Sequence, residues 1–220
     1  MKRKNILLIT LALLIIGVGV WYLVTDIQTR QANQQSTSEL NKTLGAASDN
    51  KFATLKGEAY DEAYIADMIM HHEGAVQMAE QALAVSDRKE IRDLSENIIS
   101  TQSDEIMKMR SWQQEWGYST SSSMGHGGHS GHGANPNSDM ETEMAEMMTK
   151  MSSTSGDEFD AIFLDQMIIH HQQAVDMSEF ADTNALHEEV KTLAKDVITA
   201  QEKEIKDMKQ WQRNWGFINQ

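Results

Sequence analysis

The sequence predicts an all-α protein: a four-helix bundle made of two repeated antiparallel helix pairs, with an N-terminal transmembrane helix. Three observations predict it. The segment around His71 returns around His170, apolar residues recur at three- and four-residue steps in both copies, and an uncharged apolar run lies near the N-terminus. Because one helix pair cannot bury its apolar stripe alone, the two pairs should share a core.

The repeat covers about sixty residues in each copy without a gap. Residues 57–118 form the first helix-pair repeat and residues 157–220 the second. An offset of 99 residues carries the following residues onto identical ones in the second copy: Asp61, Met68, His71, His72, Met78, Gln102, Glu105, Met109, Trp112, Trp116 and Gly117. Such a match marks a duplicated structural unit.

A membrane anchor is expected at residues 1–25. Three basic residues precede a run of nineteen uncharged residues, 6–24, which has two aromatic residues near its end. This order favours an N-terminus in the cytoplasm, with the rest of the chain on the periplasmic or extracellular side. A cleaved signal peptide is the alternative, although no Ala-x-Ala site follows the run. Either segment would export the domain.

Two segments differ in composition from the repeats. Residues 26–56 are rich in Gln, Asn, Ser and Thr without a clear period, and they are expected to form a polar stalk. Residues 119–156 form a linker, whose methionine-rich end predicts a short helix. Its Gly-rich part is expected to be mobile without metal and carries four candidate ligands: Met124, His126, His129 and His132.

Each repeat should form a long helix, a short turn and a second long helix. In the first repeat, the first helix is expected over about 58–85. Ser86 or Asp87, together with Glu90, supplies a capping signal for the second helix. That helix should stop at Gly117, because glycine tolerates the positive φ found just past a helix end. The second repeat should follow the same plan.

Composition limits the classes of partner. With 33 acidic and 19 basic side chains, the formal charge is −14. Such a surface repels nucleic acid and attracts cations, although a solvated acidic face is the simpler explanation of the same charge. The chain has no cysteine, so it has neither a disulfide framework nor a thiolate metal site. A soft metal would have to be held by methionine and histidine.

One stripe of the first helix in each repeat combines apolar and metal-ligating side chains. At about 100° per residue, Met68, His71 and Met78 share a face, with His72 at its edge. A buried imidazole needs a partner for each ring nitrogen, and a metal meets that need. Thioether and imidazole suit Cu(I) and tolerate Cu(II). The candidate copper ligands are therefore Met68, His71, His72, Met78, Met167, His170, His171 and Met177.

A second set of residues is expected either to bind metal or to orient the ligands. It comprises Gln102, Glu105, Met109, Gln201, Glu204, Met208, Met124, His126, His129 and His132. The simpler interpretation makes the methionines core filler and bonds the core histidines to carboxylates. The candidate carboxylates are Asp61, Asp160, Glu105 and Glu204. Two copies of the histidine pair, each flanked by methionines, favour metal binding over that interpretation.

The repeated motif resembles that of a bacterial family. Asp-x2-aromatic-x3-Met-Ile-x-His-His-x2-Ala-x2-Met is followed by Gln-x2-Glu-Ile-x2-Met-x2-Trp-x3-Trp-Gly, and both occur twice. This pattern resembles the family called domain of unknown function 305. The resemblance implies a ferritin-like four-helix fold, and copper-binding members of the CopM type are exported copper-handling proteins. Many members have a proline before the histidine pair, where this chain has Met70 and Ile169. Which histidine of each pair points inward is therefore left open.

The combined expectation is an exported, membrane-anchored copper-binding protein for sequestration, buffering or resistance, with Cu(I) preferred and no catalytic residues. Copper ions and the membrane are its expected partners, nucleic acid is not, and homo-oligomerisation is left open. Two other classes stay open: a ferritin-like di-iron or redox enzyme, and a metal-free interaction module tethered to the membrane. A di-iron enzyme usually carries Glu-x-x-His, whereas Met68 and Met167 stand three residues before the histidine pairs.

Overall fold

The computed structural model describes residues 51–119 and 136–218. In this part the chain is helical, apart from turns and one isolated bridge between Gly57 and Ala185. After a helical turn at 51–54, the helices are α2 (Glu58–Val85), α3 (Lys89–Trp116), α4 (Pro136–Ser152), α5 (Gly156–Ser178), α6 (Ala181–Asn184) and α7 (Glu188–Asn214). The predicted all-α class is confirmed for these residues.

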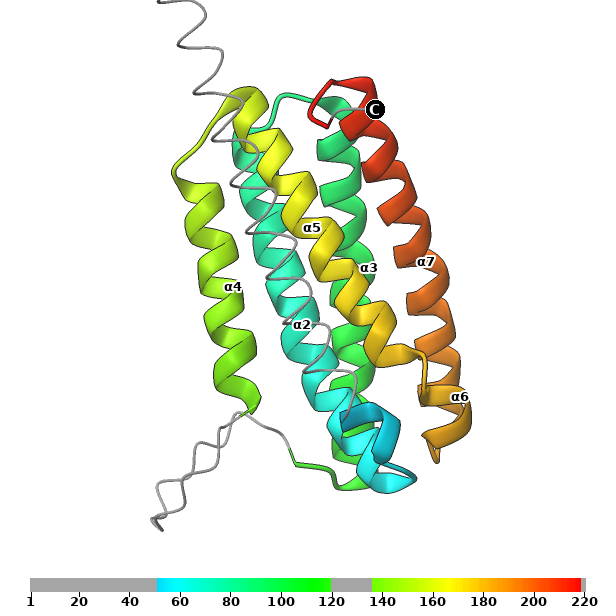
Figure 1. Ribbon diagram of the computed structural model, residues 1–220. Helices are drawn as coiled ribbons and strands as arrows, with labels where there is room; N and C mark the ends of the chain where they lie inside the picture. The colour runs from blue at the N-terminus through cyan, green and yellow to red at the C-terminus, as the bar shows by residue number, and fades with distance from the viewer. Residues whose placement is uncertain (1–50, 120–135, 219–220) are drawn as a thin grey trace, which may run out of the picture. The chain divides into compact units, whose positions relative to one another are not determined.

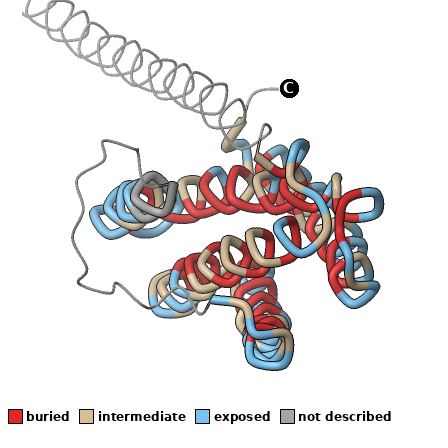
Figure 2. Tube along the Cα trace, turned by 90° about the horizontal axis from the view of Figure 1, so that it is seen from below, coloured by how far each residue is buried: buried red, intermediate tan, exposed pale blue. Residues whose placement is uncertain are grey.

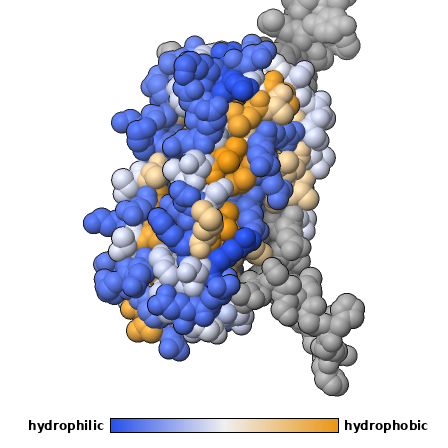
Figure 3. Space-filling model, turned by 180° about the vertical axis from the view of Figure 1, so that it is seen from behind, coloured by the Kyte–Doolittle hydropathy of each residue, from blue (hydrophilic) through white to orange (hydrophobic). Residues whose placement is uncertain are grey.

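The helices form a bundle of two antiparallel pairs. α2 packs on α3 and α5 packs on α7, and the pairs meet where α2 lies beside α5 (Figure 1). Viewed from below, the buried residues gather on the sides of the helices that face one another (Figure 2). From behind, the surface is mostly hydrophilic with a narrow hydrophobic strip, as expected from the acidic composition (Figure 3).

Three expectations concern residues outside the described ranges: the anchor at 1–25, the stalk up to residue 50, and the Gly-rich tract with Met124, His126, His129 and His132. Between residues 51 and 218, excluding the undescribed gap, no helix has the length and apolar character needed to cross a bilayer.

The ends of the first helix pair are mostly as predicted, with one correction. α2 spans the expected residues, and Gly117 ends α3 with a φ of 72°. The capping prediction is wrong, because the residue before α3 is Arg88, in extended conformation and without a capping side chain. The Ser86 hydroxyl instead accepts a hydrogen bond from the Arg88 N–H at 3.2 Å within the turn itself.

The second pair departs from the expected single helix before the turn. α5 ends at Ser178, and the short α6 leads into α7. The Ser178 hydroxyl lies 2.7 Å from the carbonyl oxygen of Ala174 and 2.9 Å from the hydroxyl of Tyr64. A serine bonded back to the fourth residue before it favours a bend in a helix. In the first repeat Ala79 stands at the equivalent position, and α2 continues to Val85.

The core consists of two apolar clusters, and the paired histidines separate them along α2 and α5. Methionines from three helices contribute to the first cluster, and methionines from four helices contribute to the second. The first cluster contains Tyr60, Tyr64, Met68, Met109 and Met177, and the second contains Met78, Phe159, Phe163, Met167 and Met208. All ten side chains are buried. The sequence periodicity therefore identified the buried faces of α2 and α5 correctly.

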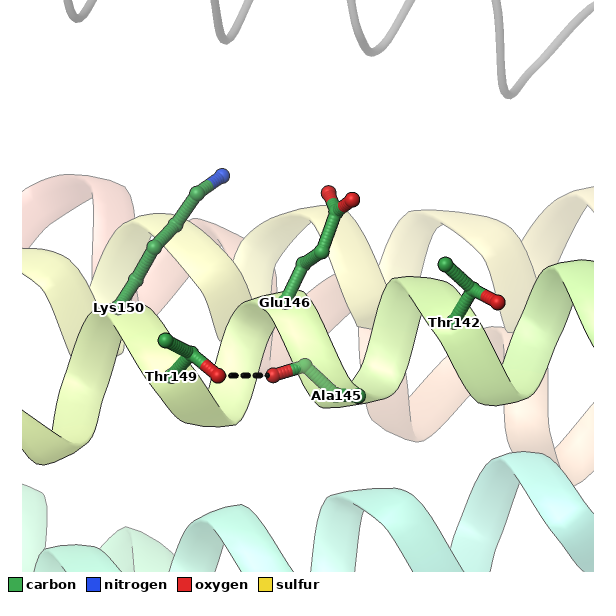
Figure 4. Close-up of a pocket in the computed structure, with 5 residues that line it drawn as sticks. All are labelled: Thr142, Ala145, Glu146, Thr149 and Lys150. Carbon is green, nitrogen blue, oxygen red and sulfur yellow. Dashed lines mark hydrogen bonds between the residues drawn. The ribbon is translucent and has the colours of Figure 1, made fainter.

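α4 lies against α2 and α5 and is not a member of either pair (Figure 1). Its buried Met147 and Met151 belong to the second cluster, and the partly buried Met144 packs against that cluster. The opposite face holds a shallow hollow lined by Thr142, Ala145, Glu146, Thr149 and Lys150 (Figure 4). All five residues belong to α4. Ligand sites usually draw side chains from several elements, so this hollow is not the candidate site.

Candidate metal centre

The four paired histidines lie in the middle of the core, each at most 2% exposed. α2 and α5 run antiparallel, so the two pairs meet across the bundle. The rings of His71 and His170 have centroids 3.6 Å apart and planes inclined by 36°. The structure answers the question of which histidine points inward: both members of each pair do, in different directions.

The second histidine of each pair is bonded to a carboxylate of the neighbouring helix. His72 Nε2 lies 2.7 Å from Glu105 Oε2, and His171 Nε2 lies 2.7 Å from Glu204 Oε2. An ionised glutamate accepts the Nε2 proton, so a neutral imidazole presents its lone pair at Nδ1. The simpler interpretation of the histidines therefore holds for one ring nitrogen of His72 and one of His171, and the carboxylates orient these rings.

Six ring nitrogens have no hydrogen-bond partner among the described side and main chains. They are both nitrogens of His71, both nitrogens of His170, and Nδ1 of His72 and His171. Each buried polar atom left in this state costs about 1–3 kcal/mol. The facing rings of His71 and His170 form no hydrogen bond with each other. The arrangement is therefore suited to a metal ion, which accepts electron pairs from ring nitrogens.

His71 and His170 are held in the neutral form that a metal ion requires. Burial, followed by the neighbouring imidazoles, lowers the pKa of His71 and His170 well below the ordinary value. The nearby Gln173 amide opposes this shift of the His71 pKa only in part. At neutral pH both rings therefore offer lone pairs rather than charge.

Thioether sulfurs lie on both sides of the histidines. Met68, Met109 and Met177 belong to one cluster, and the equivalent Met167, Met208 and Met78 belong to the other. Within 51–119 and 136–218, no three histidine or carboxylate side chains are grouped as a metal site. Imidazole together with thioether is a ligand combination that suits a soft metal.

The remaining predicted residues take different positions. Gln102 and Gln201 are buried with an unpaired Oε1, one turn before the glutamates that orient the histidines. Asp61 and Asp160 are not histidine partners within the centre. Asp61 binds His187 of a turn instead, with 2.7 Å between Oδ2 and Nδ1, and Asp160 binds Arg88.

Met144 and Gly74 were missed by the sequence reasoning. A Cβ placed on Gly74 would lie 2.1 Å from Met144 Cε and 3.3 Å from His170 Nε2. Met144 therefore fills the space over Gly74 beside His170. Two signals were available in the sequence: the methionine-rich helix, and a glycine where the second repeat has Gln173.

Comparison with known proteins identifies the family of the chain. The family model DUF305, a domain of unknown function, matches residues 21–109 and 61–212. The chain is 36% identical to CopM in the Cu(II)-bound form, covering 74% of this chain and 99% of that one with a TM-score of 0.58. For CopM in the Cu(I)-bound form the identity is 33%, the coverage 70% and 96%, and the TM-score 0.54.

A DUF305 protein from Streptomyces coelicolor is 25% identical, covering 71% of this chain and 94% of that one with a TM-score of 0.58. No protein with curated annotation matches the chain. The two overlapping family matches are compatible with two copies of one unit. On the family match and the likeness to CopM, the chain belongs to the DUF305 family.

Proposed function

We propose that the protein binds copper ions in the bundle core outside the cytoplasm and there sequesters or buffers them. One observation carries the proposal: six buried ring nitrogens without partners, on four histidines set between two methionine clusters. A core selected only for stability would replace these imidazoles by apolar side chains, which leave no polar atom unpaired.

Each group of side chains has a separate role in the proposal. His71 and His170 offer lone pairs at the contact between the repeats, and His72 and His171 offer Nδ1 while their glutamates hold the rings. The six core methionines supply the sulfur that favours Cu(I) over Cu(II) and over zinc. His126, His129, His132 and Met124 would add weaker sites at high copper concentration.

The relatives support copper as the metal and export as the route. CopM has been solved with Cu(I), with Cu(II) and with silver, a soft ion of the same group as copper. The Streptomyces coelicolor relative is a candidate secreted protein. For this chain, export would follow from the segment at 1–25, which we propose stays attached as a membrane anchor.

Metal analysis of the full chain tests the proposal. Protein purified without added metal should retain copper, and chelator competition should show tight binding of Cu(I). Replacing His71, His72, His170 and His171 by alanine together should remove the tightest sites. The matched control is Gln172→Ala, an exposed neighbour of the second pair. Iron in place of copper, or tight copper binding that survives the fourfold substitution, would contradict the proposal.

A further inference from the structure

We propose that Met144 of α4 is a Cu(I) ligand on the His170 side of the centre, admitted there by Gly74. This inference rests on the proposed copper function and adds a helix to the site. It makes the two halves of the centre chemically different, although the repeats that form them are alike.

The first step is that Gly74 has no backbone reason to be glycine. It lies in the interior of α2, and it is not among the described glycines with positive φ, namely Gly57, Gly117, Gly156 and Gly216. Glycine inside a helix costs about 1 kcal/mol relative to alanine. The structure offers a reason in space: the first carbon of any side chain would lie 2.1 Å from the end of Met144.

The second step is that the sulfur of Met144 lies beside His170 Nε2, a ring nitrogen without a hydrogen-bond partner. The position of that hypothetical Cβ is 3.0 Å from Met144 Sδ and 3.3 Å from His170 Nε2. His170 is 1% exposed, and its Nε2 has no hydrogen bond to any described residue. Thioether and imidazole donors thus border the same small volume. Methionine is flexible enough to bring its sulfur within bonding distance of an ion held there.

The third step is that α4 is attached at equivalent positions of both repeats. Gln173 is the counterpart of Gly74 at the offset of 99 residues, and its Nε2 donates to Glu143 Oε2 at 3.3 Å. One repeat therefore binds α4 through a polar contact, and the other admits the adjacent Met144. The chain has one α4 against two similar repeats. The sulfur of Met144 is therefore added beside His170 only, and the rest of the core is nearly symmetric.

Exchanging methionine for leucine separates a ligand from core filler. Leucine nearly conserves the volume and removes the sulfur. In the full chain, Met144→Leu should weaken the tightest Cu(I) binding about tenfold, the lower end of the losses seen when a metal-supporting side chain is removed. Cu(II) binding should change by less than about twofold, since imidazoles dominate it. Chelator competition for each ion and a sulfur count by X-ray absorption would measure this.

The matched control is Met151→Leu, which removes a buried thioether from the same helix two turns away. It should leave both affinities unchanged. Unchanged Cu(I) affinity in Met144→Leu, with a wild-type chain that binds copper, would overturn this inference alone. A wild-type chain that binds no copper would overturn the proposed function and the ligand together.

Gly74→Ala provides a second variant that keeps every sulfur. Its methyl group displaces the flexible end of Met144 and moves His170, whose Nε2 would lie 3.3 Å away, by only a few tenths of an ångström. Alanine favours the helix, so the fold should persist with unchanged helical circular dichroism. The variant should lose Cu(I) affinity to a similar extent. Adding Met144→Leu to Gly74→Ala should cause no further loss, because both act on the same contact. Additive losses would show that Gly74 does not act through Met144.

Discussion

Arg88 and His187 occupy equivalent positions in the two repeats, and each binds the aspartate and tryptophan of the other repeat. The Arg88 guanidinium lies 4.3 Å from the Trp215 ring, and its Nε donates to Asp160 Oδ2 at 2.9 Å. The His187 ring stacks on Trp116 with centroids 3.8 Å apart and bonds to Asp61. These two contacts join the two helix pairs.

Arg88→Ala should lower the free energy of unfolding by about 2–3 kcal/mol, because the buried Asp160 carboxylate loses its charged partner. Urea denaturation followed by tryptophan fluorescence would measure the loss. The neighbouring Lys89→Ala is the control. Its ion pair with Asp93 is exposed to solvent, so this substitution should change the free energy of unfolding much less than Arg88→Ala does. Equal effects of the two substitutions would show that the Arg88 contact does not join the pairs.

His71→Ala and His170→Ala should each weaken the tightest copper binding, and the double variant should lose little more than either single one. The reason is that the two rings face each other at 3.6 Å and would serve the same ion. Chelator competition on the wild type, the two single variants and the double variant measures how far the two losses of copper affinity depend on each other. Independent losses, each removing half of the bound copper, would instead mean one separate site in each repeat.

Stability of the metal-free protein should fall as the pH drops below about 6.5, the ordinary histidine pKa. His71 and His170 have a lowered pKa in the fold, so the unfolded chain binds their protons first and is favoured in acid. Above that pH both states are neutral and the effect vanishes. Each histidine contributes a slope of at most about 1.4 kcal/mol per pH unit.

Denaturation of the His71→Leu/His170→Leu variant from pH 7.5 to 5 provides the comparison. Its unfolding free energy should depend less on pH than that of the wild type. At pH 7.5 the variant should be at least as stable without metal, because four unpartnered nitrogens are gone. An equally steep pH dependence in the variant would assign the acid sensitivity to other groups.

Deleting residues 124–133 should lower the copper bound at excess metal and leave the tightest sites unchanged. Ordering a Gly-rich tract on binding costs conformational entropy, so its histidines bind more weakly than those held in the core. Metal analysis after dialysis at two copper concentrations would separate the classes. Loss of the tightest copper sites after the deletion would show that residues 124–133 belong to the main site.

Local sequence determined the course of the helices and the character of their faces. The bounds of α2 and the end of α3 at Gly117 follow from periodicity and from the glycine there, which are short-range properties. The same periodicity placed Met68 and His71 on the buried face. Nothing beyond one or two helical turns is needed for these conclusions, and the structure agrees with each of them.

Tertiary packing decided which buried side chains meet. Periodicity says that His71 and His170 face inward, but only the antiparallel register of α2 and α5 puts their rings in contact. The capping signal at Ser86 failed for a related reason, since Arg88 before α3 forms contacts in the other repeat. Met144 lies over Gly74, beside His170, because α4 packs against both α2 and α5, which belong to different repeats. Such contacts depend on the whole core, whereas helical periodicity is set residue by residue.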